Sequence, residues 1–150
     1  MSGAQPIDSE GLPGFEELFL EGSFVLDITA DRDVVLFVVN AALRPRHPLY
    51  EPPSDAAHCF RRLQIVFRSV RKATWFSRSD RVYTDAGGRK DRGCIDTFTA
   101  TPEGQYVLEG DWGGITIESA SPCVRLMGPV PSAWQGRRHA IDAWLAGTED

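Results

Sequence analysis

Alternating apolar and polar positions in the first third of the chain predict paired strands. Phe24, Leu26 and Ile28 alternate with the residues between them, which is the two-residue period of a half-buried strand. A polar break at 30–33 separates this segment from an unbroken apolar run at 34–39. Two such runs around a short polar break predict a β-hairpin. Because the second run is apolar on both faces, we expect it to lie centrally in its sheet and to be covered on both sides.

The same period continues through segment 58–76, where Leu63, Ile65 and Phe67 share one face. No Gly, Pro or Asn lies near Ser69, so the segment is either a tight hairpin or one long strand with a bulge. Further along, turn residues divide the chain into short apolar segments. These predict a three-stranded meander and a fourth strand, at 94–100, 105–112, 115–119 and 123–127.

Three segments depart from the strand pattern. Residues 1–13 are small and polar and predict a flexible arm. The segment from Phe15 to Leu20 predicts either a helical turn or a short first strand. The helical turn is favoured, because two glutamates near the start of the segment suit a helix N-terminus. The segment 44–55 contains four prolines and predicts a long loop. A crossover between two sheets is favoured for this loop over a binding loop.

The C-terminal segment 132–145 predicts an amphipathic helix. Ser132 can cap its N-terminus, and Ile141 and Leu145 fall at helical spacing. Consecutive strands joined by short turns and followed by one helix indicate a mainly β (α+β) fold. We therefore predict an antiparallel, meander-rich sandwich or partly open barrel with a C-terminal helix, forming a single domain over 14–146.

Composition indicates a bacterial, cytoplasmic protein. The three cysteines fall at unrelated spacings, and the N-terminus lacks the charged and apolar parts of a secretion signal. No apolar run approaches the roughly 20 residues that span a membrane. Arginine far outnumbers lysine, and Ala, Gly and Pro are abundant, which is typical of GC-rich bacterial genomes.

Charge is distributed unevenly along the chain. The net charge is −5, but the segment Arg61–Arg92 carries +7 and the remainder −12. Overall acidity disfavours nucleic-acid binding. Strand alternation places Arg62 and Arg68 opposite the apolar face, so they predict a basic stripe that also includes Trp75. We expect the acidic remainder of the same chain, or of a second copy in a homodimer, to neutralise this stripe. An acidic partner is the alternative.

The sequence contains no assembled catalytic or cofactor-binding motif. No histidine pair or cysteine pair has metal-ligand spacing, and no Gly-x-Ser-x-Gly elbow is present. We predict no metal and no cofactor. The remaining route to an enzyme is a pair of acids, Glu109 and Asp111, which share a strand face near Asp96. A solvated outer face is the favoured interpretation of that pair.

Trp112 is followed by two glycines and is expected at a turn, partly exposed and available to a partner. The sequence thus favours a non-enzymatic protein-binding module, and toxin neutralisation is one setting for such a small bacterial protein. One alternative is a small-molecule-binding barrel or small hydrolase that uses Glu109, Asp111 or Asp96. The other is an anion or nucleic-acid binder that uses the Arg61–Arg92 stripe with Trp75.

The predicted helix is expected to pack its apolar stripe against the sheet, because so short a helix is marginal in water on its own. Ile141→Ala should then lower the free energy of unfolding by about 2–5 kcal/mol in denaturant titrations. A loss below about 0.5 kcal/mol would show that 132–145 is an appended tail.

Overall fold

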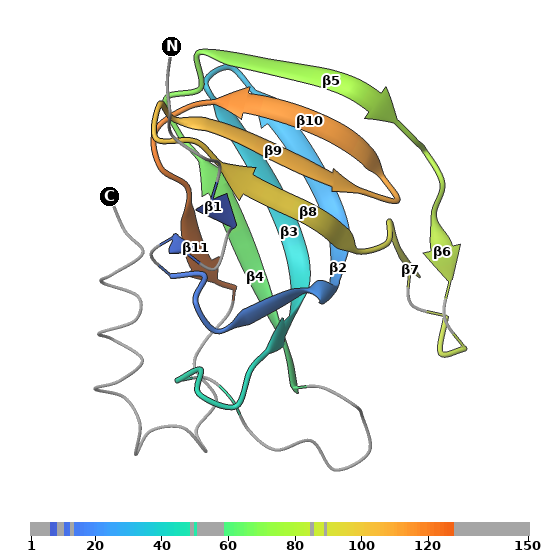
Figure 1. Ribbon diagram of the computed structural model, residues 1–150. Helices are drawn as coiled ribbons and strands as arrows, with labels where there is room; N and C mark the ends of the chain where they lie inside the picture. Colours follow the sequence, from blue (N-terminus) through green and yellow to red (C-terminus); the bar gives the residue numbers. More distant parts are fainter. Residues whose placement is uncertain are drawn as a thin grey trace.

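The computed structural model describes residues 7–8, 11–12, 14–48, 50, 59–84, 86–88 and 90–127. Over these residues the protein is mainly β, and two antiparallel sheets pack face to face without closing into a barrel. Figure 1 shows β8, β9 and β10 crossing in front of β2, β3 and β4. The sequence-based prediction of a mainly β, antiparallel fold is confirmed. The predicted helix at 132–145 lies outside the described residues.

Eleven strands make up the described part. The five-stranded sheet has the order β1 (Ile7–Asp8), β8 (Ile95–Ala100), β9 (Gln105–Gly110), β10 (Gly113–Glu118) and β5 (Lys72–Arg78). The four-stranded sheet has the order β11 (Cys123–Leu126), β4 (Cys59–Phe67), β3 (Val34–Leu43) and β2 (Leu18–Asp31). A small ribbon pairs β6 (Tyr83–Thr84) with β7 (Lys90–Asp91). The predicted meander is present as β8, β9 and β10.

Aromatic side chains from both sheets form the centre of the core. The ring of Phe67, on β4, lies 6.1 Å from that of Phe37, on β3. It also lies 6.0 Å from Phe98 on β8 and 5.6 Å from Tyr106 on β9. All four side chains are buried. Because one ring touches three others from both sheets, this cluster fixes how the two sheets sit on each other.

The β2–β3 hairpin forms where the sequence predicts it. The two-residue turn contains Arg32, whose φ of 55° is in the left-handed region. β3 lies between β2 and β4, as expected for an apolar run. Its inward residues Val35 and Phe37 are buried, but its outward residues Leu36 and Val38 are only half-buried. The expectation that β3 is covered on both faces is therefore only partly met.

The segment 58–76 is neither a hairpin nor one bulged strand. It forms β4 and β5, which belong to different sheets. Ser69 between them has a φ of 54°, and the Val70 N–H donates to the Asp33 carbonyl oxygen at 2.8 Å. The chain therefore changes sheets at Ser69. The predicted fourth strand of the meander also changes sheets, since β11 pairs with β4.

Two further expectations are wrong. The residues from Phe15 to Leu20 do not form the favoured helical turn, because Leu18 and Leu20 point inward at strand spacing and start β2, as the strand alternative predicts. The loop after β3 is not a crossover between sheets, because β3 and β4 are adjacent in one sheet. Of the predicted N-terminal arm, β1 pairs with β8, and Leu12 is buried.

The start of the proline-rich loop folds back onto the domain. The Arg44 N–H donates to the Glu17 carbonyl oxygen, and the His47 N–H donates to that of Arg44, both at 2.9 Å. His47 is only 2% exposed. Burial lowers the pKa of His47 from 6.5 to about 4, because the charged imidazolium is poorly solvated there. The neutral imidazole is therefore the form that the folded protein holds at neutral pH.

Replacement of an inward aromatic side chain on β3 tests the sandwich. Phe37→Ala should lower the free energy of unfolding by about 3–5 kcal/mol, because its ring also lies 5.3 Å from Trp112. Val38→Ala, on the outward face of the same strand, should cost about 1 kcal/mol. Equal losses in urea titrations would contradict this orientation of β3.

The buried His47 predicts a pH dependence of stability. The unfolded state takes up a proton near pH 6.5 but the folded state only near pH 4, so unfolding is favoured as the pH falls between these values. The loss should reach up to about 3 kcal/mol at pH 4 and vanish above pH 6.5. His47→Gln should flatten this part of the profile in chemical unfolding. An unchanged profile would mean that other groups cause the dependence.

Candidate functional site

β5 ends the five-stranded sheet and leaves one strand edge open. It pairs with β10, and six of its seven residues are exposed. Over the residues that the structure describes, no strand pairs with its other edge, which lies at the top of Figure 1. An edge of this kind presents main-chain N–H and C=O groups in the arrangement that another strand can pair with.

A β-bulge places an aromatic ring on this edge strand. The register between β5 and β10 shifts between Gly114 and Ile115, and Phe76 has no partner residue on β10. The Phe76 ring lies over Gly114, where a Cβ atom would collide with the ring carbons. Phe76 is 53% exposed even so. Glycine at position 114 therefore leaves room for the Phe76 ring, which stays half exposed on this edge strand.

Trp75, the neighbour of Phe76, connects β5 to the core. Its ring packs edge-on against Trp112 with a centroid distance of 6.0 Å and an angle of 88°. The Arg78 guanidinium lies 4.7 Å from the Trp75 centroid, within cation–π range. Trp75 is half-buried. Its contacts thus connect β5 and Arg78 to the core.

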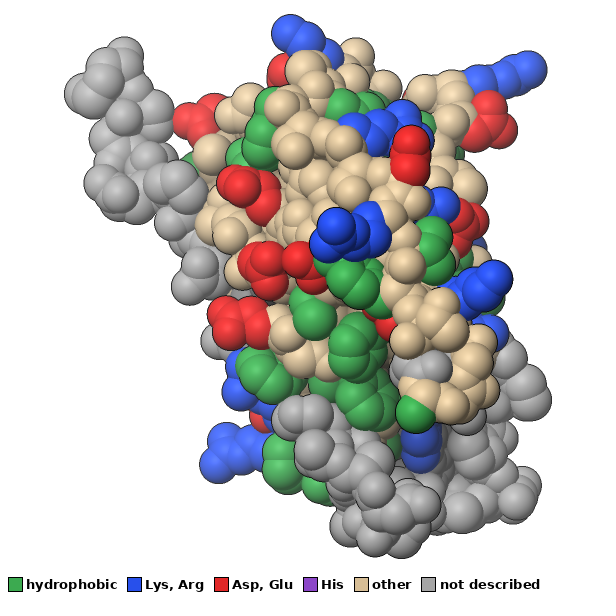
Figure 2. Space-filling view, turned by 90° about the vertical axis from the view of Figure 1, so that its right-hand side faces the viewer, with side chains coloured by type: hydrophobic (Ala, Val, Ile, Leu, Met, Phe, Trp, Pro, Cys, Tyr) green, Lys and Arg blue, Asp and Glu red, His purple; other side chains and the backbone are tan. Residues whose placement is uncertain are grey.

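The segment that follows β5 exposes further apolar side chains. Val82 and Tyr83 are 48% and 37% exposed, and the Arg81 guanidinium lies 5.9 Å from the Tyr83 ring. With Phe76 they are the exposed large hydrophobic residues of the described part of the chain. We call residues 71–83 the edge segment. In Figure 2, which views the molecule from the side of β6 and β7, hydrophobic side chains lie among basic and acidic ones.

The predicted basic stripe is divided between separate surfaces. Arg62 and Arg68 lie on or next to β4, in the four-stranded sheet. Trp75 and Lys72 lie on β5, in the other sheet. Arg62 is exposed and Arg68 half-buried. The structure therefore does not bring Arg62 and Arg68 together with Trp75, because the chain changes sheets between them.

Trp112 is at a turn, as predicted, but it is not available to a partner. It is 1% exposed. Its Nε1–H donates to the Cys94 carbonyl oxygen at 3.1 Å, and its ring packs against Phe37 and Trp75. The indole folds back over Gly110, where a Cβ atom would collide with it. The expectation of an exposed Trp112 is wrong because the two neighbouring strands leave room for the ring inside the sandwich.

The three predicted acids do not share one pocket. Glu109 is exposed, opposite Thr97 and Gly114. Asp111 is exposed in the β9–β10 turn, where its Oδ2 accepts from the Cys94 N–H at 3.4 Å. Partial burial raises the pKa of the Cys94 thiol, and the charges of Asp111, Asp96 and Asp91 raise it further. Cys94 is therefore held as a thiol, which is a weak nucleophile.

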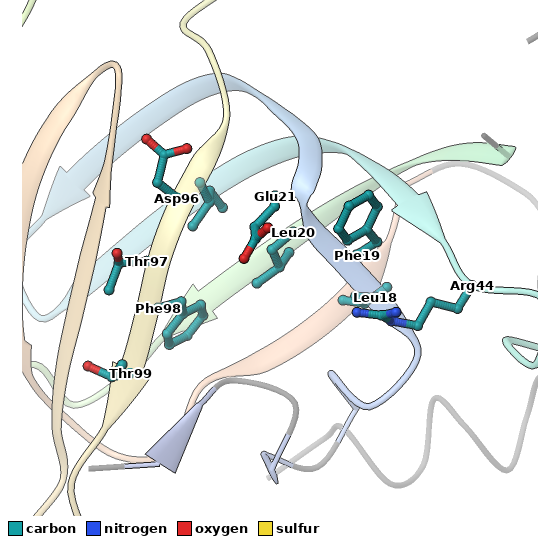
Figure 3. A pocket seen from close by; sticks show the side chains of 10 residues that line it. Leu18, Phe19, Leu20, Glu21, Arg44, Asp96, Thr97, Phe98 and Thr99 are labelled. Carbon is teal, nitrogen blue, oxygen red and sulfur yellow. The ribbon is translucent and has the colours of Figure 1, made fainter. Parts of the chain in front are cut away.

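Asp96 lines a cleft between the two sheets. The cleft has a volume of about 310 Å³ and lies between the edges of β2 and β8 (Figure 3). Its apolar residues include Leu18 and Leu20 from β2 and Ile95 and Phe98 from β8. Its charged residues are Glu21, Arg44 and Asp96. Sequence reasoning missed Glu21 and Arg44, because neither lies in a motif and the two walls belong to strands far apart in the chain.

Bulges in both strands shape this cleft. In β2 the partner of Phe19 is Ala42 and that of Phe24 is Asn40, so four residues of β2 stand opposite one of β3. The Ser23 hydroxyl fills the gap: it accepts from the Ala42 N–H and donates to the Phe19 carbonyl oxygen, both at 2.8 Å. In β8 the register shifts between Ile95 and Thr97, around Asp96.

One bridge closes the cleft at its end. Phe24 of β2 pairs with Cys94 just before β8, and the Val25 N–H donates to the Gly93 carbonyl oxygen at 2.8 Å. The strands β2 and β8 separate beyond this bridge. β1 pairs with β8 only at Thr99 and Ala100. Over the residues that the structure describes, the part of β8 between Cys94 and Thr99 therefore keeps an open strand edge on the side of the cleft.

Comparison with known proteins provides no further assignment. No family model, curated protein or solved structure matches this chain. Within the described ranges, no group of three or more His, Cys, Asp or Glu side chains could hold a metal ion. The helix search, limited to the same ranges, finds none long and apolar enough to cross a membrane. The candidate sites are thus the edge segment and the cleft.

Proposed function

We propose that this protein is a protein-binding module that receives an extended, acidic segment of its partner along the open edge of β5. The observation that carries the proposal is the exposure of β5 itself: six of seven residues are exposed in a strand that ends its sheet. Addition of a partner strand satisfies the open main-chain groups, while the side chains around them select the partner.

The other sheet edges are shorter or covered. β1 has two residues and β11 has four. β2 is long, but the Arg92 N–H donates to the Val25 carbonyl oxygen at 2.8 Å, so part of its edge is bonded to the chain before β8. β5 has seven residues, and no strand of the described part pairs with any of them on the outer side. Its length is that of an ordinary strand and is sufficient for a partner strand to pair with.

The charge of the edge segment selects an acidic partner. Residues 71–83 contain four basic residues and one acidic residue, and all five are exposed. Lys72 and Arg78 stand at the two ends of β5. If two copies paired antiparallel about Trp75, Lys72 of each copy would face Arg78 of the other. Like charges directly opposite destabilise a strand pair, so this symmetric self-pairing is disfavoured.

Exposed apolar side chains give the same surface a hydrophobic contact. Phe76 lies on β5, and Val82 and Tyr83 lie in the chain that follows it. Aromatic side chains are enriched at protein interfaces, where they supply large contact areas at a small entropic cost. A partner strand with acidic residues and one apolar side chain opposite Phe76 would complement this surface. A toxin that presents such a strand is one partner of this class.

A synthetic peptide provides the test. An alternating peptide such as Glu-Val-Glu-Thr-Glu-Val-Glu should bind with a Kd of about 1 mM or tighter and shift the amide NMR signals of Lys72–Arg78. The double variant Lys72→Glu/Arg78→Glu should weaken binding at least about tenfold, because both ends of β5 then repel the peptide. A control peptide with Lys in place of each Glu should not bind.

Arg62→Glu/Arg125→Glu is the matched control, because it makes the same charge change at exposed positions of the other sheet. It should change the Kd less than about twofold. Equal weakening by both double variants would show non-specific attraction and overturn the proposal. Light scattering should show a monomer. A dimer that Lys72→Glu/Arg78→Glu abolishes would instead assign β5 to self-association.

A further inference from the structure

We infer that the cleft between β2 and β8 binds a small primary amine, in which one ammonium group is joined to a short apolar body. This site is separate from the proposed binding edge, because β9 and β10 lie between β8 and β5 in the sheet. Four features of the cleft favour such a ligand: its bulged walls, its carboxylates, its open strand edge and its apolar lining.

Bulges in both walls bring one carboxylate from each sheet to the cleft. Between Phe19 and Phe24, four residues of β2 stand opposite one residue of β3, and Glu21 is among the four. In the other sheet, the register of β8 shifts around Asp96. Glu21 and Asp96 both line the cleft. β-Bulges redirect side chains and are frequent next to functional sites.

Both carboxylates are available to a cation. Glu21 and Asp96 are exposed, and among the described residues neither carboxylate makes a hydrogen bond or an ion pair. Figure 3 shows the Glu21 side chain directed into the space between β2 and β8. An ammonium group held there would form charge-assisted hydrogen bonds, which are about twice as strong as neutral ones. An anion would be repelled by the same two groups.

The open edge of β8 provides further acceptors for an ammonium group. Between Cys94 and Thr99, no strand of the described residues pairs with this edge. Main-chain groups along a strand point alternately to its two edges, so some carbonyl oxygens of β8 face the cleft. A primary ammonium has three N–H donors, which a carboxylate and such carbonyl oxygens can satisfy together. A quaternary ammonium has no N–H donor, and we therefore expect selectivity for a primary amine.

The basic end of the cleft sets the direction of the ligand. In Figure 3, Arg44 and Asp96 lie at opposite ends, with Glu21 between them. The Arg44 guanidinium lies 5.3 Å from the centroid of the Phe19 ring, and Arg44 has further interactions within the protein. Arg44 thus needs no ligand, but its charge repels a cation from that end. The ammonium group therefore belongs at the acidic end, with the body of the ligand extending away from it.

The walls beside the carboxylates suit an apolar body. They are formed by Leu18, Leu20, Ile95 and Phe98, each at most 7% exposed. The volume of about 310 Å³ is at the lower end of small-ligand pockets, which limits the body to a short chain. A neutral ligand of the same shape would remove water from the carboxylates without replacing it. A short alkyl amine meets both the charge and the apolar lining.

Four matched probes test the inference by isothermal titration calorimetry. Hexylamine, hexanol, hexanoate and hexyltrimethylammonium share one alkyl chain and differ in the head group. Hexylamine should bind with a Kd of about 1 mM or tighter and shift the amide NMR signals of Leu18–Glu21 and Ile95–Thr99. Hexanol, which lacks the charge, and hexyltrimethylammonium, which lacks N–H donors, should bind at least about tenfold more weakly. Hexanoate should not bind.

Variants assign the contact to the two carboxylates. Glu21→Gln should weaken hexylamine binding about tenfold and leave hexanol binding unchanged, which also shows that the walls are intact. Glu21→Gln/Asp96→Asn should bring hexylamine and hexanol to similar Kd values. Asp27→Asn is the matched control, because it removes an exposed carboxylate from β2 beyond the bridge at Phe24. It should change the Kd less than about twofold. Thermal unfolding checks that each variant is folded.

Several results would overturn the inference. One is that hexylamine does not bind at about 10 mM, or shifts only amide signals outside the cleft. Another is that hexanol, hexanoate or hexyltrimethylammonium binds as tightly as hexylamine. A third is that Asp27→Asn weakens hexylamine binding as much as Glu21→Gln. The expected order of the four probes, lost in the double variant and kept in Asp27→Asn, would establish the cleft as a site for a primary amine.

Discussion

The packing of Phe67 against aromatic rings from both sheets is the contact on which the rest of the structure depends. Its neighbours are Phe37 from its own sheet and Phe98 and Tyr106 from the other. Trp112 extends the cluster and donates its Nε1–H to the Cys94 carbonyl oxygen. That hydrogen bond satisfies the one polar group of the ring in an otherwise apolar core. The cluster therefore sets both the distance between the sheets and the place where β8 begins.

The edges of the sandwich follow from this arrangement. Because the start of β8 is held at Cys94, Phe24 on β2 can form a β-bridge with Cys94. This bridge joins the two sheets on that side. Beyond the bridge the bulged strands separate and leave the cleft. At the far side of the five-stranded sheet, Trp75 packs on Trp112 and connects β5 to the core, and no strand of the described residues covers the outer edge of β5. One aromatic core thus supports both candidate sites.

Local pattern predicted the strands well and their partners less well. The period-2 segments and the glycine and polar turns located the β2–β3 hairpin and the meander, because strand spacing and turn chemistry are properties of neighbouring residues. The sheet change at Ser69 carried no such signal, because serine is not a typical residue for a φ of 54°. The chain nevertheless changes sheets at this residue, so that β4 and β5 pair with different neighbours.

The candidate sites were predictable only in part, for a related reason. Asp96 drew attention as an acid, but its neighbour in the cleft is Glu21, which is 75 positions earlier in the chain. Trp112 and its glycines correctly indicated a turn, while the direction of the indole depended on the space that Gly110 leaves beside Cys94. Contacts between distant segments and the volumes left by missing side chains are properties of the fold, and a single sequence does not display them.

The division of charge shows how an acidic protein can present a basic surface. The excess charge of +7 between Arg61 and Arg92 does not form one continuous positive surface, because these residues are distributed over β4, β5 and the β6–β7 ribbon. At physiological salt, charges more than about 8–10 Å apart are largely screened from each other. The proposed partner at β5 would therefore respond to Lys72, Arg78 and their neighbours, and hardly to the net charge of −5. Local placement, which the fold determines, thus decides which ligand each surface can attract.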